Sequence, residues 1–232
     1  MVTMEQNLVH EQTRQGGTDR LDKQRRKISD LASMQLKIGS QTRLFWAFGV
    51  WILAAGTGSA LLWKHALTPA PLPRLPPVLP SVPGLETHAA GLPTLLVFLH
   101  PLCPCSEASF SELLKVARAA QGRARILVLM YEPEAKPVDW KDSKLARRVR
   151  ASQEVHWMED TTGRIAAQFG VEASGTAVLY DKEGALVYGG GLTWARGHEG
   201  ENAGVDAMIE FIVKGKTSLR ARPVFGCKIL AD

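Results

Sequence analysis

The sequence predicts an α/β protein in which helices cover both faces of a central mixed sheet, preceded by one membrane-spanning helix. Two observations support this prediction. From residue 92 onward, short apolar runs typical of buried strands alternate with amphipathic helical patterns, an order typical of a sheet between helices. Before that, residues 44–63 form an uncharged stretch of bilayer-spanning length.

The chain divides into four segments by composition. We expect a basic tail at 1–43, a transmembrane helix at 44–63, a linker at 64–91 and a folded domain at 92–232. The tail is polar, so we expect it to be poorly ordered, with a short lipid-bound helix near KQRRK as the alternative. The linker region is rich in proline, which disfavours helices and central strands, and we expect an extended spacer.

The stretch LFWAFGVWILAAGTGSALLW at 44–63 would span roughly 30 Å as a helix, the thickness of the hydrocarbon core. Trp46 and Trp63 lie near its ends, where aromatic rings favour the membrane interface. A buried core helix would show a polar face, and a cleaved signal peptide would have shorter polar and apolar regions. We therefore expect an uncleaved anchor, with cleavage near LTPA as the alternative.

Basic residues are distributed unevenly around this stretch. Residues 24–43 contain five Lys and Arg, whereas residues 64–83 contain two. The positive-inside rule then places the N-terminus in the cytoplasm and the domain outside. For a bacterial chain this is an inner-membrane, single-pass protein with a periplasmic domain, in a compartment that permits disulfides.

The charge of the domain argues against nucleic-acid binding. The chain has a net charge of +5, of which the first 43 residues contribute +3, because they hold eight basic and five acidic residues. Residues 64–232 hold twenty basic and eighteen acidic residues and are nearly neutral. A nucleic-acid-binding domain would carry the positive field itself.

Local patterns predict the elements of the domain in order. Residues KEG separate the last two apolar runs and indicate a hairpin. The run 202–214 begins with Asn202, a good helix cap. We expect strands at 94–99, 125–131, 154–160, 176–181 and 185–190, and helices at 106–120, 139–151, 161–169 and 202–214.

Three motifs carry a resemblance to a known superfamily. A buried strand ends directly before a Cys-containing helix start, FGV turns into a later strand, and LYDKEG forms a hairpin. Over residues 92–215 the chain resembles the thioredoxin-like superfamily, which implies a three-layer sandwich. The motifs HPLCPCS, GGLTWARGH and PVFGC resemble more narrowly the RedB-like group of membrane-anchored thioredoxin-like proteins.

The chain departs from the thioredoxin pattern at two places. Cys103 falls on the first cysteine of the usual Cys-x-x-Cys motif and Ser106 on the second, so that Cys105 is an additional thiol. The cis-proline that usually packs beside the cysteines and helps to receive a substrate peptide is replaced by Gly175. This replacement puts general protein-disulfide exchange in doubt.

The predicted chemistry is thiol–disulfide exchange with a partner protein or a small thiol, which requires no cofactor. Cys103 is expected at a helix N-terminus, where partial positive charge favours the nucleophilic thiolate. We expect Cys105 to resolve the mixed disulfide or to pair with Cys103, and Cys227 is the alternative partner. His100 and Pro101 precede the motif and are supporting candidates, although His100 could simply close the strand end.

Two other functions remain open from the sequence. His100, Cys103 and Cys105 offer soft ligands suited to copper(I) or zinc, with Cys227 or His198 as a fourth ligand. His198 belongs to the glycine-rich loop 189–204, whose composition indicates unusual backbone angles or a close approach of another segment. The remaining alternative is a binding domain that kept the fold without catalysis.

Overall fold

The computed structural model describes residues 2–71, 73–82, 91–134, 140 and 142–229. The chain forms two compact units, Met1–Leu62 and Trp63–Asp232. The second unit contains the sheet, the cysteines and all of the site.

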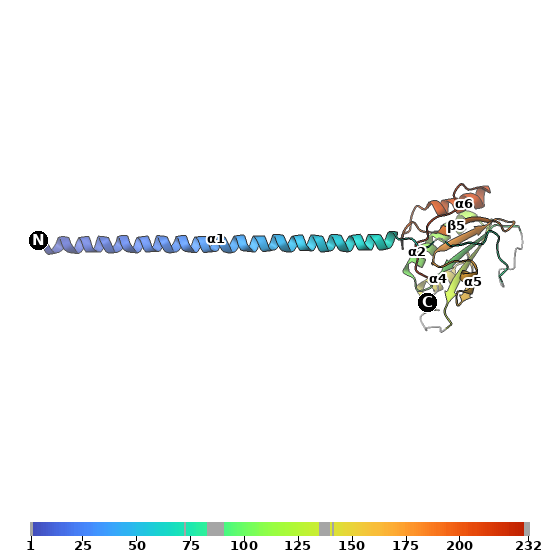
Figure 1. The fold of residues 1–232 in the computed structure, drawn as a ribbon, viewed down its shortest axis with the longest axis horizontal. Helices are drawn as coiled ribbons and strands as arrows, with labels where there is room; N and C mark the ends of the chain where they lie inside the picture. Colours follow the sequence, from blue (N-terminus) through green and yellow to red (C-terminus); the bar gives the residue numbers. More distant parts are fainter. Residues whose placement is uncertain (1, 72, 83–90, 135–139, 141, 230–232) are drawn as a thin grey trace. The chain divides into compact units, whose positions relative to one another are not determined.

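Helix α1 runs over Val2–Leu67 (Figure 1). Its part Thr42–Leu67 is long and apolar enough to cross a membrane, and includes the stretch predicted to do so. The large apolar side chains of this part, such as Trp46 and Trp51, are exposed within its own unit, whereas those of a buried core helix would be covered. Residues 2–43, where we expected a poorly ordered basic tail, are drawn as part of the same helix, and the order of this tail stays a prediction.

The domain contains the elements that the sequence predicts, with shifted ends. Residues 139 and 141, at the expected start of the second helix, lie outside the described residues. Helix α4, Lys144–Ala151, is capped by Ser143, whose side chain accepts a hydrogen bond from the Ala146 N–H. The strands are β1 Thr94–Leu99, β2 Arg125–Glu132, β3 His156–Thr161, β4 Thr176–Tyr180 and β5 Leu186–Gly191, and the helices are α2 Pro104–Ala120, α4 Lys144–Ala151, α5 Arg164–Gln168 and α6 Ala203–Lys214.

The strands form one mixed sheet in the order β3-β2-β1-β4-β5. Strand β1 lies at the centre, parallel to β2 and antiparallel to β4. Strand β2 is also parallel to β3, and β4 forms the predicted antiparallel hairpin with β5. Every residue of β1 is buried, as expected for a strand covered on both faces.

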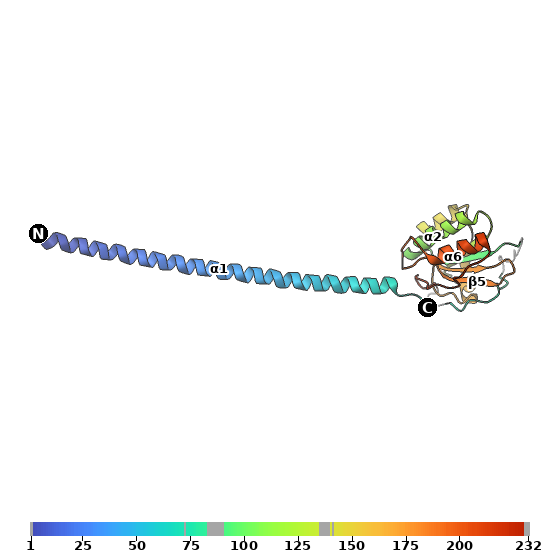
Figure 2. The same ribbon diagram turned by 90° about the horizontal axis from the view of Figure 1, so that it is seen from above.

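Two apolar clusters cover the two faces of the sheet. On one face, α2, α4 and α6 pack against alternate residues of β1 and β2, including Leu95, Val97 and Val128. Helices α2 and α6 lie side by side on this face (Figure 2). On the other face, α5 and irregular segments pack against Leu96 and Phe98. This three-layer arrangement confirms the predicted fold class.

The proline-rich segment is not the free spacer that we expected. Residues 73–82 run along the domain, where the Pro77 carbonyl accepts a hydrogen bond from Leu186 N and the Leu79 N–H donates to Gly184 O. The side chains of Leu79 and Val82 are buried in the second apolar cluster. Prolines do not prevent this packing, because a carbonyl of a proline still accepts hydrogen bonds.

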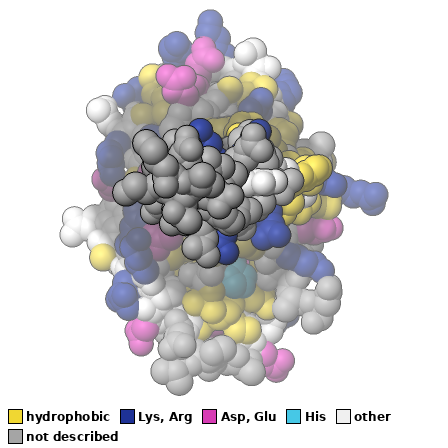
Figure 3. Space-filling model, turned by 90° about the vertical axis from the view of Figure 1, so that its left-hand side faces the viewer, with side chains coloured by type: hydrophobic (Ala, Val, Ile, Leu, Met, Phe, Trp, Pro, Cys, Tyr) yellow, Lys and Arg dark blue, Asp and Glu magenta, His cyan; other side chains and the backbone are white. Residues whose placement is uncertain are grey.

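Charged side chains of both signs are distributed over the domain. Figure 3 shows Lys and Arg side chains scattered around one face of the molecule, with acidic ones among them. In the basic helix α4, Arg148 contacts the Glu107 carboxylate, and Arg150 lies 3.9 Å from the carboxylate of Glu159. The basic residues of this helix are thus partnered within the domain.

Candidate functional site: a three-cysteine centre

Cys103 is the N-cap residue of α2, directly after the turn that follows β1. Its backbone is extended, its N–H donates to the His100 carbonyl at 3.0 Å, and its carbonyl accepts from Ser106 N at 3.0 Å. Pro104 occupies the first helical position, where a missing N–H costs no hydrogen bond. The Cys103 side chain therefore lies at the partially positive end of a helix of 17 residues, as predicted.

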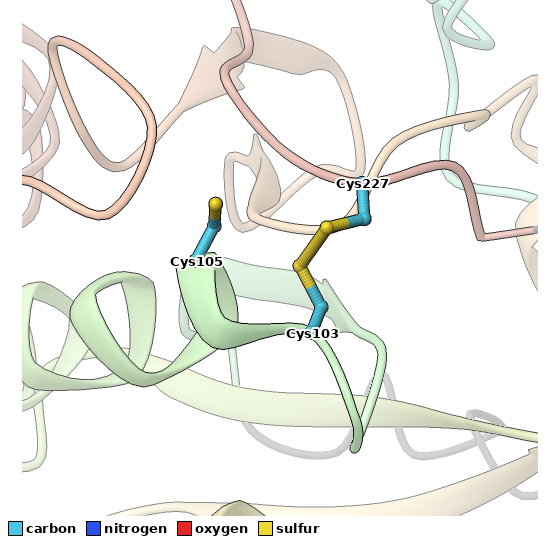
Figure 4. Close-up of side chains that lie close together, drawn as sticks. All are labelled: Cys103, Cys105 and Cys227. Atoms are coloured by element: carbon cyan, nitrogen blue, oxygen red, sulfur yellow. A yellow bond between two sulfur atoms is a disulfide. The ribbon is translucent and has the colours of Figure 1, made fainter. Parts of the chain in front are cut away.

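Cys103 forms a disulfide with Cys227, which lies 124 residues later in the chain (Figure 4). The two Cα atoms are 6.2 Å apart, within the usual range for disulfides. This finding corrects the expected pairing of Cys103 with Cys105, and matches the alternative partner that the sequence left open. The Cys103 side chain is 4% exposed, whereas Cys227 is half-buried.

Cys105 keeps a free, half-buried thiol in the first turn of α2. Its sulfur and those of Cys103 and Cys227 all lie within 4.8 Å of one another. In Figure 4, Cys103 and Cys105 come from the start of α2, and Cys227 faces them from the opposite segment. The structure thus assembles a centre of three sulfurs.

The segment 220–229, which we call the docking segment, carries Cys227 to the site. It pairs with residues 172–174 in a strand-like manner, because Ser174 N–H donates to Cys227 O and Ile229 N–H donates to Glu172 O, both at 2.8 Å. The Ile229 side chain is buried in the second apolar cluster. These contacts do not involve the sulfur atoms, so they hold Cys227 near Cys103 independently of the disulfide.

Glycines allow the docking segment to approach closely. A Cβ on Gly226 would lie 1.7 Å from the Ser174 carbonyl oxygen. In β5, a Cβ on Gly190 would lie 2.4 Å from the Arg222 carbonyl oxygen, and one on Gly191 would lie 2.5 Å from that of Pro223. The glycine-rich run therefore serves the close approach of a backbone, one of the two roles that its composition predicted.

Arg196, from the same glycine-rich loop, connects the docking segment to the end of α1. Its guanidinium donates to the Gly226 carbonyl, and to the carbonyls of His65 at 3.2 Å and Thr68 at 3.4 Å. Its backbone N–H donates to Ala66 O at 3.1 Å. A cation at a helix C-terminus is favourable, and here the same cation fixes the residue before Cys227.

Ser106, in the place of the usual second cysteine, belongs to a buried hydroxyl network. Its Oγ lies 2.5 Å from Ser174 Oγ, which accepts the His100 N–H at 2.9 Å. Ser106 is fully buried. The network joins the end of β1, the first turn of α2 and the segment before β4, so Ser106 has a structural contact at this position.

Gly175 has a conformation that proline cannot adopt. Its φ is +85°, and its N–H donates to the Phe98 carbonyl at 2.8 Å, whereas proline has a φ near −65° and no N–H. The described residues contain no cis peptide bond. A Cβ at this position would lie 2.6 Å from Ser109 Oγ. The predicted departure from the family pattern therefore has a structural basis.

His100 does not lie in the sulfur cluster, which corrects the expected ligand set. Its ring stacks on Tyr131 at 5.5 Å and meets Trp140 edge-on at 4.8 Å, and its Nδ1 accepts the Leu102 N–H at 3.3 Å. Burial lowers its pKa below the ordinary value, partly offset by a backbone hydrogen bond. His100 thus acts as a neutral, aromatic wall of the turn before Cys103.

We predict a pH dependence of stability that originates at His100. Because its pKa is lowered in the folded state, the unfolded chain binds a proton more readily once the pH falls below about 6.5. The free energy of unfolding should therefore decrease as the pH is lowered through this value. Urea unfolding between pH 7.5 and 5 should show a smaller decrease for His100→Gln; an unchanged slope would contradict the assignment.

Of the two residues considered as a fourth metal ligand, Cys227 lies with the other sulfurs and His198 lies away from them. It is exposed, its ring lies 4.9 Å from that of Trp194, and its Nδ1 lies 2.9 Å from the Arg196 carbonyl oxygen. Pro101 is buried within the turn before α2. Among the described side chains, the three cysteines alone form the group with metal-ligating geometry.

Sequence reasoning missed two residues of the site. Ser174 supplies both the hydroxyl that binds Ser106 and the N–H that binds the Cys227 carbonyl. In the sequence, the observation that could have identified Ser174 is its position directly before Gly175, which replaces the usual cis-proline. Arg196 was visible as a polar residue of the glycine-rich loop, but no local pattern indicated that it would contact the docking segment.

No protein-family model and no curated protein matches the chain. Several solved structures are similar to it. A hypothetical protein from Sinorhizobium meliloti is 22% identical, with 70% of this chain and 95% of that chain covered and a TM-score of 0.53. An uncharacterized conserved protein from Geobacillus kaustophilus is 17% identical, with coverages of 70% and 93% and a TM-score of 0.54.

A thioredoxin lipoprotein of Streptococcus pneumoniae is 20% identical, with coverages of 53% and 84% and a TM-score of 0.40. At their identities, the likenesses to the Sinorhizobium and Geobacillus proteins concern the fold alone. The strand order, with β1 central and Cys103 at the start of the following helix, is that of a thioredoxin-like fold. The chain thus has a thioredoxin-like fold, and the resemblance to the RedB-like group stays a prediction.

Proposed function

We propose that the protein is a membrane-anchored thiol–disulfide redox protein whose working pair is Cys103 and Cys227. The observation that carries this proposal is the disulfide between the cysteine at the N-terminus of α2 and a cysteine held on the docking segment. The thioredoxin-like fold supports it, because this fold places the first cysteine at a helix N-terminus, where its thiolate is stabilised. Cys105 is a third thiol beside the pair.

In the direction that reduces a substrate, the Cys103 thiolate attacks one sulfur of the substrate disulfide. A Cys103–substrate disulfide forms and the first substrate thiolate leaves. Cys227 then attacks Cys103 Sγ, the Cys103–Cys227 bond forms, and the second substrate thiolate leaves. Two electrons pass to the substrate, and the two thiolates take up protons from water.

In the direction that oxidises a dithiol, a substrate thiolate attacks the Cys103–Cys227 bond. Cys227 is the more exposed of the two sulfur-bearing residues, so we expect attack at its sulfur, with Cys103 as the leaving thiolate. The helix N-terminus stabilises that thiolate, and a stabilised thiolate leaves faster. The second substrate thiol then attacks the substrate sulfur of this mixed disulfide, the substrate disulfide forms and the Cys227 thiolate leaves, which completes a two-electron reduction of the protein.

The proposed location is the outer side of the bacterial inner membrane. Helix Thr42–Leu67 would be the anchor, and the excess of Lys and Arg before it favours a cytoplasmic N-terminus. A periplasmic domain is consistent with a disulfide, since oxidising compartments preserve such bonds. The partner would be a protein dithiol or disulfide, or a small thiol.

A redox titration of the full chain in detergent tests the proposal. The protein is equilibrated in glutathione buffers of graded ratio, quenched with acid, alkylated and mapped by mass spectrometry. We expect Cys103 and Cys227 to gain and lose the label together as a two-electron couple, while Cys105 remains labelled throughout. A Cys103–Cys227 bond that never opens across the series would instead indicate a structural disulfide in a non-catalytic binding domain.

Two variants provide the controls. Cys105→Ser should retain the couple, because the docking segment holds Cys227 without it. The double variant Cys105→Ser/Cys227→Ser should accumulate a glutathione mixed disulfide on Cys103, because both thiols able to resolve it are gone. Loss of the couple in Cys105→Ser would restore Cys105 to the resolving role that the sequence suggested.

A further inference from the structure

We propose that reduction of the Cys103–Cys227 bond converts the centre into a site for one copper(I) ion, held by the sulfurs of Cys103, Cys105 and Cys227. The sequence suggested a different set, with His100 as a ligand, and the structure places that ring against Tyr131 and Trp140 instead. The new set rests on the mutual distances of the three sulfurs, all within 4.8 Å.

The three sulfurs remain together when the disulfide is open, because independent contacts position each of them. Cys103 and Cys105 are fixed by the first turn of α2. Cys227 is fixed by the backbone pairing of the docking segment with Ser174 and by the buried side chain of Ile229. Small rotations of the cysteine side chains are then sufficient to bring all three sulfurs to a common ion.

The chemistry of the donors selects a soft ion of low coordination number. Thiolates favour copper(I) and zinc among the biological metals, and a closed zinc site requires four ligands. No His, Asp or Glu among the described side chains joins the three cysteines within the same distance. Three sulfurs without a fourth protein donor therefore fit copper(I) better than zinc.

The surroundings offset the negative charge of such a centre. Three thiolates and one copper(I) carry a net charge of −2. The free N–H groups at the start of α2 present partial positive charge to the sulfurs, and Arg196 binds the carbonyl of Gly226, next to Cys227. Binding releases up to three protons from the thiols and transfers no electron.

Metal binding and the disulfide exclude each other. The bond occupies two of the three sulfurs and leaves the Cys105 thiol alone. A two-electron reductant, such as a phosphine that is converted to its oxide, must therefore open the bond first. The site goes beyond the proposed redox function, because it requires Cys105, which the couple does not.

Anaerobic titration tests the proposal on the full chain in detergent, after phosphine reduction and removal of the phosphine. Copper(I) is supplied against a chromophoric competing chelator, and the ligands are identified by X-ray absorption. We expect one copper(I) per chain with three sulfur neighbours. Cys105→Ser and Cys227→Ser should each weaken binding by more than the roughly 10–100-fold that loss of an outer-shell partner costs.

His198→Gln is the matched control, because this residue was a candidate ligand and lies outside the cluster. This variant should bind copper(I) with the same affinity as the parent protein. The oxidised protein should not compete with the chelator. Equal copper affinity in Cys105→Ser, a nitrogen ligand in the absorption spectrum, or tighter binding of zinc than of copper(I) would each overturn the proposal. Since Cys105→Ser should keep the redox couple, failure of the metal site leaves the proposed function testable by itself.

Discussion

Reduction of the Cys103–Cys227 bond is expected to lower the free energy of unfolding by about 3–5 kcal/mol. The bond closes a loop of 124 residues, and opening it restores freedom mainly to the unfolded chain. Urea unfolding of the full chain in detergent, followed by tryptophan fluorescence with and without a phosphine reductant, measures the difference.

Cys105→Ser is the matched control for this measurement. Its thiol takes no part in the bond, so the oxidised variant should unfold within about 0.5 kcal/mol of the parent and lose the same amount on reduction. An equal free energy of unfolding in the oxidised and reduced parent would mean that the bond does not constrain the chain.

Gly226→Ala is expected to displace the docking segment and to weaken the disulfide. The added Cβ would lie 1.7 Å from the Ser174 carbonyl oxygen, a backbone atom that cannot rotate away. Overpacking of this kind costs about 1–3 kcal/mol, which corresponds to roughly 5–150-fold in the equilibrium constant for closing the bond. Equilibration with glutathione, followed by alkylation and mass spectrometry, reports that constant.

Gly56→Ala provides the comparison, because a Cβ at that helical position would have nothing within 4 Å. It should leave the Cys103–Cys227 equilibrium unchanged. If Gly226→Ala closes the bond as readily as Gly56→Ala, the pairing between Ser174 and the docking segment does not position Cys227.

The sheet could be predicted from the sequence because its strands are buried on both faces. A strand such as β1, with every residue buried, reads as a continuous apolar run, and the KEG turn identifies the hairpin of β4 and β5. The first and last residues of the helices were harder to predict from the sequence, because the capping residues determine where a helix begins and ends. Ser143 starts α4 later than the apolar pattern alone suggested.

The proline-rich segment shows where composition is insufficient. Proline excludes regular helix and central strand, and that part of the reasoning holds. It does not determine whether the segment packs on a surface. Tyr180 illustrates the difference, because its hydroxyl donates to the Pro76 carbonyl at 3.1 Å, a contact between residues 104 positions apart.

The site could be predicted in part. The position of Cys103 at a helix start followed from local pattern, and so did the presence of Cys105 beside it. The bond to Cys227 depends on the backbone pairing of 172–174 with the docking segment, which no local pattern encodes. His100 was assigned to the wrong set because its sequence neighbours are cysteines, whereas its spatial neighbours are aromatic rings.

The long sequence separation within the pair also has a consequence for biosynthesis. A ribosome completes Cys103 and Cys105 more than a hundred residues before it adds Cys227. In the proposed periplasmic location, the first two thiols would meet the oxidising compartment during export while the third is still being made or threaded. In that location the native bond could close only after Cys227 has crossed, and any earlier bond between Cys103 and Cys105 would have to be exchanged before it forms.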